Sequence, residues 1–199
     1  MNAKVGVLAL QGAFAAHQIA LADCGVETRQ VRVAADLEGL NGLVIPGGES
    51  TTMSNLLLRA GMFEAVSRVI NSGMHVFGTC AGMIMLADQV LDGRADQVSF
   101  AAMDISVRRN AYGRQVDSFE TELQVEGLNS NFHAVFIRAP KVEHCGSEVQ
   151  ILASYEDSPV LIRQGNLMAA SFHPELSNDS RIHELFIELI LKSPMKVSK

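Results

Sequence analysis

Cys80 is the residue whose surroundings most clearly suggest chemistry. It stands in the centre of GTCAG at 78–82, between an apolar run that predicts a strand and a run, Met83–Val90, that predicts a helix. Glycines two positions before and after such a residue are typical of a nucleophile elbow, a tight turn without room for a Cβ at those places. The N-terminus of the following helix favours a thiolate. From the pentapeptide alone, a small buried core cysteine is an equally good interpretation.

A histidine and a carboxylate stand close together in SFHPE at 171–175. Residues two apart in an extended backbone point the same way, and Pro174 restricts the preceding residue to extended geometry, so Glu175 is expected beside His173. A thiolate needs a base that takes and returns a proton, and that base needs an orienting acid. Cys80, His173 and Glu175 fill these roles if the elbow and the last strand end at the same sheet edge. The alternative for His173 is a turn histidine with a satisfied hydrogen bond.

A glycine pair lies in PGGEST at 46–51, directly after another candidate strand. Consecutive glycines before a helix can direct a backbone N–H toward an anion. Attack of a thiolate on a carboxamide creates an oxyanion that needs two such donors, and the N–H groups of Gly48 and Ala81 are the candidates. A phosphate-binding loop or an ordinary turn is the alternative, although the lysine and the spacing of a P-loop are missing.

Two arginine-bearing segments, 108–115 and 136–140, offer guanidinium groups suited to the α-carboxylate of a free amino acid. Most surface arginines are solvated, so their residue type alone does not assign them a role. Glu143, His144 and Cys145 are adjacent but have no second cluster, and the other histidines lack a partner at ligand spacing, so no metal is expected. Those histidines are His17, His75, His133 and His183.

These segments need a fold that brings strand ends together. In the first half, short apolar runs alternate with helical patterns, which indicates a parallel sheet with helices on both faces. In the second half, strand-like runs with short connections suggest antiparallel additions to that sheet. The expected strands are Val5–Leu10, Thr28–Val33, Gly42–Ile45, His75–Gly78, Met103–Val107, Glu120–Val125, Ala134–Ile137, Val149–Tyr155, Val160–Gln164 and Leu167–Phe172, and the expected helices are Ala13–Cys24, Ser50–Leu58, Met83–Val90 and Ser180–Lys192.

Composition limits the possible classes of protein. A chain of 199 residues with 48% hydrophobic and 19% charged residues indicates one compact domain, 1–199, in which only the tail 193–199 is expected to be disordered. The net charge of −6 without a Lys/Arg run argues against a nucleic-acid partner, and no apolar run has the length of a membrane span. The apolar start is interrupted by Gln11, which favours a strand over a signal peptide. Three cysteines without CxxC spacing fit a cytoplasmic protein.

Together the motifs resemble the class I, triad-type glutamine amidotransferases, a family with a three-layer, flavodoxin-like α/β fold, a mixed sheet with parallel central strands, and helices on both faces. GTCAG and HPE are typical of the whole family. PGGEST, RNAYGRQVDSFE at 109–120 and VFIRAP at 135–140 are similar to one group within it, the glutaminase subunits of pyridoxal 5'-phosphate (vitamin B6) synthases. The resemblance covers nearly the whole chain, from Val5 to about Lys192.

The resemblance implies hydrolysis of L-glutamine to glutamate and ammonia through a thioester, with Cys80 as nucleophile, His173 as acid and base, and Glu175 as orienting carboxylate. It implies no cofactor and, as the partner that receives the ammonia, a TIM-barrel synthase subunit. The chain departs from the family pattern at Ala16, where an acidic residue usually precedes His17 in a segment that faces the partner. The residues expected to hold glutamine are Gly48, Glu49, Ser50, Arg109, Ile137 and Arg138.

Other interpretations use the same residues. A glutaminase of another pathway, such as that of imidazole glycerol phosphate synthase, lacks the long motifs at 109–120 and 135–140. DJ-1-like proteins and α/β-hydrolases also use an elbow nucleophile, but in α/β-hydrolases the acid precedes the histidine, whereas Glu175 follows His173. A non-catalytic binding module on this fold would require a broken triad, and all three residues are present.

Overall fold

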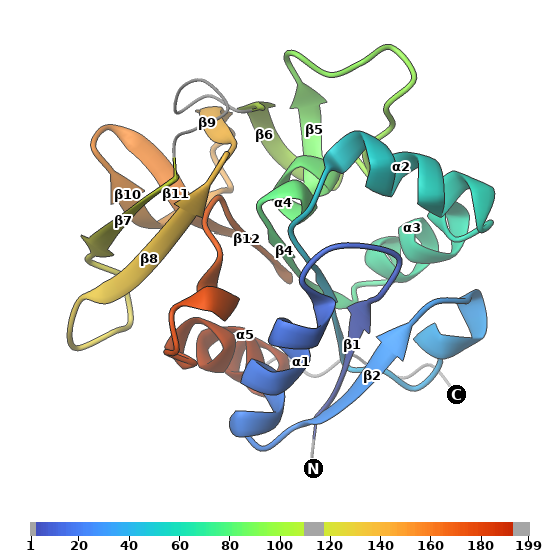
Figure 1. Ribbon diagram of the computed structural model, residues 1–199, viewed down its shortest axis with the longest axis horizontal. Coiled ribbons are helices and arrows are strands. Elements are labelled where there is room, and N and C mark those ends of the chain that lie inside the picture. The colour runs from blue at the N-terminus through green and yellow to red at the C-terminus, as the bar shows by residue number, and fades with distance from the viewer. Residues whose placement is uncertain (1–2, 110–117, 193–199) are drawn as a thin grey trace.

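A seven-stranded sheet forms the centre of the computed structural model, which describes residues 3–109 and 118–192 (Figure 1). The strand order is β10-β11-β12-β4-β3-β1-β2. The strands from β12 to β2 are mutually parallel, and β11 and β10 extend the sheet in antiparallel fashion. The bounds are β1 Lys4–Leu8, β2 Glu27–Val31, β3 Gly42–Ile45, β4 His75–Thr79, β10 Gln150–Tyr155, β11 Ser158–Gln164 and β12 Leu167–Ala170.

Helices cover both faces of this sheet, as the continuous burial of its central strands requires. Leu43 belongs to the core cluster under α2, α3 and α4, whereas its neighbour Val44 belongs to the cluster under α1 and α5. Successive side chains of a strand point to opposite faces, so a strand buried on both sides must have two covering layers. The fold is therefore the expected three-layer α/β arrangement (Figure 1). The helices are α1 Phe14–Asp23, α2 Ser50–Arg59, α3 Phe63–Asn71, α4 Ala81–Leu86 and α5 Arg181–Lys192.

Two small sheets stand apart from the central one, and here the sequence-based expectation was wrong. The expected strands at 103–107, 120–125 and 134–137 do form, but they do not extend the central sheet. One small sheet packs on the α4 side and the other on the α5 side. Alternating burial identifies a strand without specifying its partner. The strands are β5 Ala87–Val90, β6 Met103–Arg108 and β9 Lys141–Cys145 in one sheet, and β7 Ser118–Leu123 and β8 Phe132–Ile137 in the other.

The helix expected over Met83–Val90 also differs. It begins at Ala81, ends at Leu86, and continues directly into β5, where Ala87 is already extended and pairs with Met103. A short, fully apolar run does not distinguish a buried helix from a strand by periodicity. Short 3₁₀ helices, η1 Ala34–Leu37 and η2 Pro174–Leu176, complete the fold. The tail 193–199 and most of the motif at 109–120 lie outside the described residues. Within the described part, no helix has the length and apolar character of a membrane span.

Candidate active site

The turn after β4 places Cys80 at the carboxyl edge of the central sheet. Cys80 has a positive φ of 49° and precedes α4, and its N–H bonds to Ala170 O at 2.8 Å. A Cβ on Gly78 would lie 2.6 Å from the backbone of Gly82, and a Cβ on Gly82 would lie 2.0 Å from Ile45 O. Both positions therefore require glycine, as the elbow motif predicts.

His173 reaches the same edge because β12 pairs directly with β4. Its N–H bonds to Val135 O at 2.8 Å, which fixes the backbone against β8. The imidazole lines the same pocket as Cys80, whose Sγ lies 3.9 Å from Ile137 O, and its Nδ1 lies 2.8 Å from Glu175 Oε1. Cys80 and His173 are 6% and 8% exposed, so this row of three side chains is largely shielded from water.

Glu175 comes to His173 by a different local geometry from the one expected. His173 is roughly extended, with φ −108° and ψ 85°, but Glu175 itself lies in the 3₁₀ turn η2. The preceding proline opens this turn, where its missing N–H leaves no donor unsatisfied. The two side chains still meet, so a 3₁₀ turn brings Glu175 beside His173, where an extended backbone was expected to do so.

The electrostatics of the row favour a charged histidine. Burial would lower the pKa of His173, but its interactions with Cys80 and Glu175 raise it to about 10. Burial would likewise raise the pKa of Glu175, yet interactions with His17 and His173 keep it below the ordinary value. An imidazolium between a carboxylate and a thiol stabilises the thiolate, which is the nucleophilic form.

A pocket of ≈ 140 Å³ opens beside Cys80. The structure brings all six residues expected to hold glutamine into its walls, together with Cys80 and His173. Ile84 also lines it; sequence reasoning missed this residue, because only its place one turn into α4 brings it next to the thiol. The six are Gly48, Glu49, Ser50, Arg109, Ile137 and Arg138.

Arg109 joins several elements at one wall of the pocket. Its Nη1 donates to Thr51 Oγ1 and to Gln97 Oε1, both at 3.0 Å, and its Nη2 contacts Glu49 Oε1 at 3.0 Å. Glu49 in turn caps α2 by accepting from the N–H groups of Thr51 and Thr52. Burial opposes the charge on Glu49, but these hydrogen bonds lower its pKa to about 2. The role of Gln97 carries no sequence signal, since it depends on a contact between distant loops.

One candidate oxyanion donor, Ala81, directly follows Cys80, and the other, Gly48, lines the same pocket as the thiol. Ala81 is the first residue of α4, and the first N–H groups of a helix have no acceptor within it. A Cβ on Gly12 would lie 1.8 Å from Gly47 O, so this carbonyl faces the loop that follows β1. In a trans peptide the Gly48 N–H points away from Gly47 O and therefore away from Gly12.

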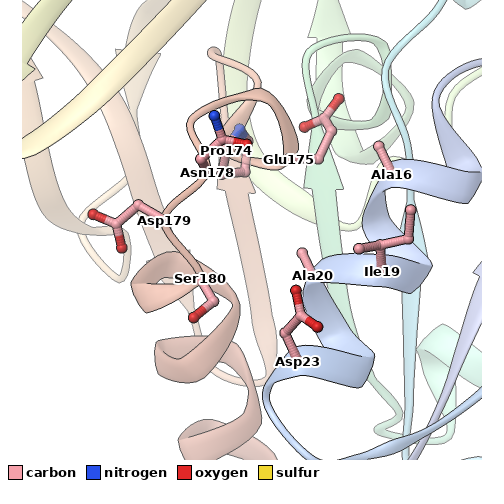
Figure 2. A pocket seen from close by; sticks show the side chains of 9 residues that line it. All are labelled: Ala16, Ile19, Ala20, Asp23, Pro174, Glu175, Asn178, Asp179 and Ser180. Atoms are coloured by element: carbon pink, nitrogen blue, oxygen red, sulfur yellow. The ribbon is translucent and has the colours of Figure 1, made fainter.

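A second pocket, of ≈ 340 Å³, lies between α1 and the segment 174–180 (Figure 2). Figure 2 shows Ala16, Ile19, Ala20 and Asp23 along α1, facing the turn that carries Glu175. Cys80 and His173 do not line it, so we place the chemistry in the smaller pocket. Among the described residues, no group of His, Cys, Asp and Glu is arranged to hold a metal ion.

Comparison with known proteins identifies the family. The model of the SNO glutamine amidotransferase family matches residues 7–192, which include every residue of the Cys80 pocket. This chain belongs to that family. It is 54% identical to "Pyridoxal 5'-phosphate synthase subunit PdxT" of Corynebacterium jeikeium, over 94% of this chain and 96% of the relative, and 50% identical to the protein of the same name from Thermosipho africanus, over 95% and 100%.

Solved structures agree with this assignment. A crystal structure of a glutamine amidotransferase is 49% identical, covers 94% of this chain and 98% of its own, and superposes with a TM-score of 0.88. The structure of PurLQS from Thermotoga maritima is 16% identical, covers 96% of this chain and 99% of its own, and superposes with a TM-score of 0.65. The similarity to PurLQS concerns the fold alone. The similarity to pyridoxal 5'-phosphate synthase subunits rests on the relatives with about half of their residues identical.

Proposed function

We propose that this chain is the glutaminase subunit of a pyridoxal 5'-phosphate synthase, and that Cys80, His173 and Glu175 hydrolyse L-glutamine to glutamate and ammonia. The observation that carries the proposal is the placement of these three side chains at one sheet edge, where Glu175 hydrogen-bonds to His173 and both His173 and Cys80 line the pocket beside Arg109 and Arg138. The relatives that carry this name match the chain almost from end to end.

The first half of the reaction forms a thioester. The Cys80 thiolate attacks the carboxamide carbon of glutamine, and the carbonyl oxygen becomes an oxyanion that accepts hydrogen bonds from the N–H groups of Gly48 and Ala81. Losing one such donor reduces the rate by roughly 10²–10³. The His173 imidazolium then gives its proton to the departing nitrogen, so ammonia leaves and a γ-glutamyl thioester remains on the sulfur.

The second half restores the enzyme. The neutral His173 takes a proton from water, whose oxygen attacks the thioester carbon. Collapse of this intermediate breaks the carbon–sulfur bond and releases glutamate, while the thiolate and imidazolium return to their starting pair. Glu175 holds the ring in orientation and stabilises its positive charge without itself becoming protonated. No step requires a metal or a cofactor.

The pocket has the charges to recognise a free amino acid. Arg138 and Arg109 are cations on its walls, and Glu49 is an anion. A guanidinium suits the α-carboxylate of glutamine, and a carboxylate suits its α-ammonium group. Ile84 and Ile137 provide apolar surface for the side-chain methylenes. A substrate with both backbone charges is thereby favoured over a simple amide.

The ammonia is expected to pass to a TIM-barrel synthase subunit, in keeping with the subunit name of the relatives. Cys24 and Cys145 are free thiols, in agreement with a reducing, cytoplasmic location for the complex.

Ammonia release from L-glutamine tests this function, measured with and without the synthase subunit. We expect Cys80→Ala to reduce release to background, because no other group forms the thioester. Cys24→Ala is the matched control, since Cys24 is a partly buried thiol at the end of α1, and it should keep full activity. Activity that survives in Cys80→Ala, or no release by the wild-type complex, would overturn the proposal.

A further inference from the structure

Two buried histidines stand behind the proposed triad, and the mechanism above gives neither of them a role. His17 lies on α1 and His183 on α5, and both side chains are completely buried. His17 Nδ1 lies 3.0 Å from His183 Nε2, and His17 Nε2 lies 3.1 Å from Thr79 Oγ1 and 3.3 Å from Glu175 Oε2. Glu175 therefore sits between two imidazole rings, His173 at Oε1 and His17 at Oε2.

The chemistry of the contacts fixes where the protons lie. Burial lowers the pKa of His17 and that of His183, so both rings are neutral and each carries one N–H. An unprotonated His17 Nε2 would hold its lone pair 3.3 Å from a carboxylate oxygen, which is repulsive, whereas a protonated Nε2 donates to Thr79 Oγ1 and is attracted to that oxygen. His17 Nε2 therefore carries the proton, and its Nδ1 accepts from His183 Nε2–H.

The same assignment of protons explains the surroundings of His183, the histidine farther from Glu175. With its proton on Nε2, His183 has a bare Nδ1, and this atom has no hydrogen-bond partner within the described part of the chain. An unprotonated nitrogen tolerates such a place better than an unpaired N–H donor. The N–H of His183 is thus directed to His17, and the N–H of His17 to the Thr79 hydroxyl, with Glu175 Oε2 close to the same ring nitrogen.

Glu175 needs such a partner. Its side chain is completely buried, and no Lys or Arg of the described chain forms an ion pair with it. A buried carboxylate with one donor on one oxygen is costly, because its second oxygen loses hydration without compensation. Glu175 Oε2 has no hydrogen-bond partner within the described part of the chain, and the Nε2 of the neutral His17 ring lies 3.3 Å from it. The dipole of the ring N–H is therefore favourable for the charge on Oε2, and it restrains rotation of the carboxylate that orients His173.

We propose that His17 is a positioning residue of the glutaminase reaction, which fixes Glu175 and keeps it ionised, and that His183 holds His17 in the required tautomer. The inference rests on the proposed function, since it assigns a role through Glu175. His17 lines neither the Cys80 pocket nor any part of the proposed substrate site, so its action is through the carboxylate alone.

Steady-state kinetics of the complex with the synthase subunit test this role. His17→Leu, which removes the ring N–H beside Oε2, is expected to lower kcat by about 10-fold, the lower end of the loss typical of a hydrogen bond to a charged group. KM should change little, because the pocket is untouched. His17→Gln places an amide N–H near the position of Nε2 and should restore most of kcat. His183→Leu should lower kcat by a smaller factor, because it only removes the contact that holds His17 in its Nε2-protonated tautomer.

The matched control is His75→Leu, which removes a completely buried histidine at the start of β4, outside both pockets. It should reduce stability without lowering kcat. The pH profile separates positioning from packing: with its donor lost, Glu175 protonates more readily, so the acidic limb of kcat/KM should move to higher pH in His17→Leu and return in His17→Gln. Equal kcat and an unmoved limb in folded His17→Leu would overturn the inference.

An NMR measurement and a comparison of two variants complete the test. If His17→Leu does not fold, ¹⁵N NMR of the histidines in the wild-type chain reports the tautomer directly, and a proton on His17 Nδ1 would refute the assignment. The Cys80→Ala control separates the two proposals. An inactive Cys80→Ala together with a fully active His17→Leu removes only the positioning role, whereas an active Cys80→Ala removes the glutaminase mechanism itself.

Discussion

Arg109 and Glu49 form an ion pair, 3.0 Å between Nη2 and Oε1, that links the residue after β6 to the N-cap of α2 across one wall of the Cys80 pocket. The arginine is 17% exposed and the glutamate 45%, so the pair lies at the solvent boundary of the pocket. An exposed pair of this kind contributes little to stability by itself. The pair instead fixes the shape of the pocket wall, because the same guanidinium also donates hydrogen bonds to Thr51 and Gln97.

Replacement of Arg109 by lysine should therefore impair substrate binding more than folding. A single ammonium group does not bridge three acceptors in one plane, so the pocket wall loses its shape. We expect KM for glutamine to rise about tenfold, the effect of losing roughly 1.4 kcal/mol of binding, with kcat nearly unchanged. The control is Arg108→Lys, whose partner Glu143 lies on the exposed face of the small sheet. Equal KM values in the two variants would contradict the role of Arg109.

Glu175→Gln should be less damaging than His173→Ala. The histidine moves protons in both halves of the reaction, whereas the carboxylate orients the ring. In serine proteases, loss of the orienting acid reduces kcat by about 10⁴ and loss of the histidine by about 10⁶. We expect the same order here for ammonia release by folded variants of equal thermal stability. A Glu175→Gln enzyme slower than His173→Ala would show that the roles are wrongly assigned.

The stability of the chain should fall as the pH rises from neutral toward 10. His173 has an ordinary pKa of 6.5 when unfolded and about 10 when folded, so over this interval the folded state binds the extra proton. Its contribution to stability is complete below pH 6.5 and is lost as the pH passes the folded value. Urea unfolding at several pH values checks this: the free energy of unfolding should decline more steeply in wild type than in His173→Gln. Parallel pH curves for the two proteins would contradict it.

Gly82→Ala should destabilise the fold strongly. The added Cβ would lie 2.0 Å from Ile45 O, a backbone atom of the neighbouring strand that has no freedom to move aside. We expect a loss of more than about 3 kcal/mol in urea unfolding, beyond ordinary overpacking. The control is Gly39→Ala, where φ is 73° and nothing lies within 4 Å, so that only the left-handed backbone is penalised, by about 1–2 kcal/mol. Similar losses in both variants would show that the elbow is not tightly packed.

The parts of the site that the sequence predicts are those encoded in short, contiguous motifs. The elbow around Cys80, the segment with His173 and Glu175, and the glycine loop each follow a strand, and parallel strands bring their carboxyl ends to one edge. Gln97 and His17 were not predicted as partners of Arg109 and Glu175, because each meets its partner only through contacts between distant elements.

The same limit applies to the fold. The β-α alternation of the first half specifies parallel pairing, since each helix returns the chain to the same end of the sheet. The later strands have no such intermediate helices, and their alternation is compatible with several partners. For this reason β6 and β8 were correctly expected as strands, but their separation into two small sheets was not.

The insertion of β12 between β4 and β11 has a consequence for the synthesis of the protein on the ribosome. Until the segment 167–175 has emerged, β4 has an open edge beside it, and Cys80 has neither its base nor the acceptor at Ala170. An open, apolar parallel strand is prone to wrong pairing, and such long-range contacts form late. The nascent chain therefore carries a thiol that cannot yet hydrolyse glutamine, and catalytic competence arises in the same event that closes the central sheet.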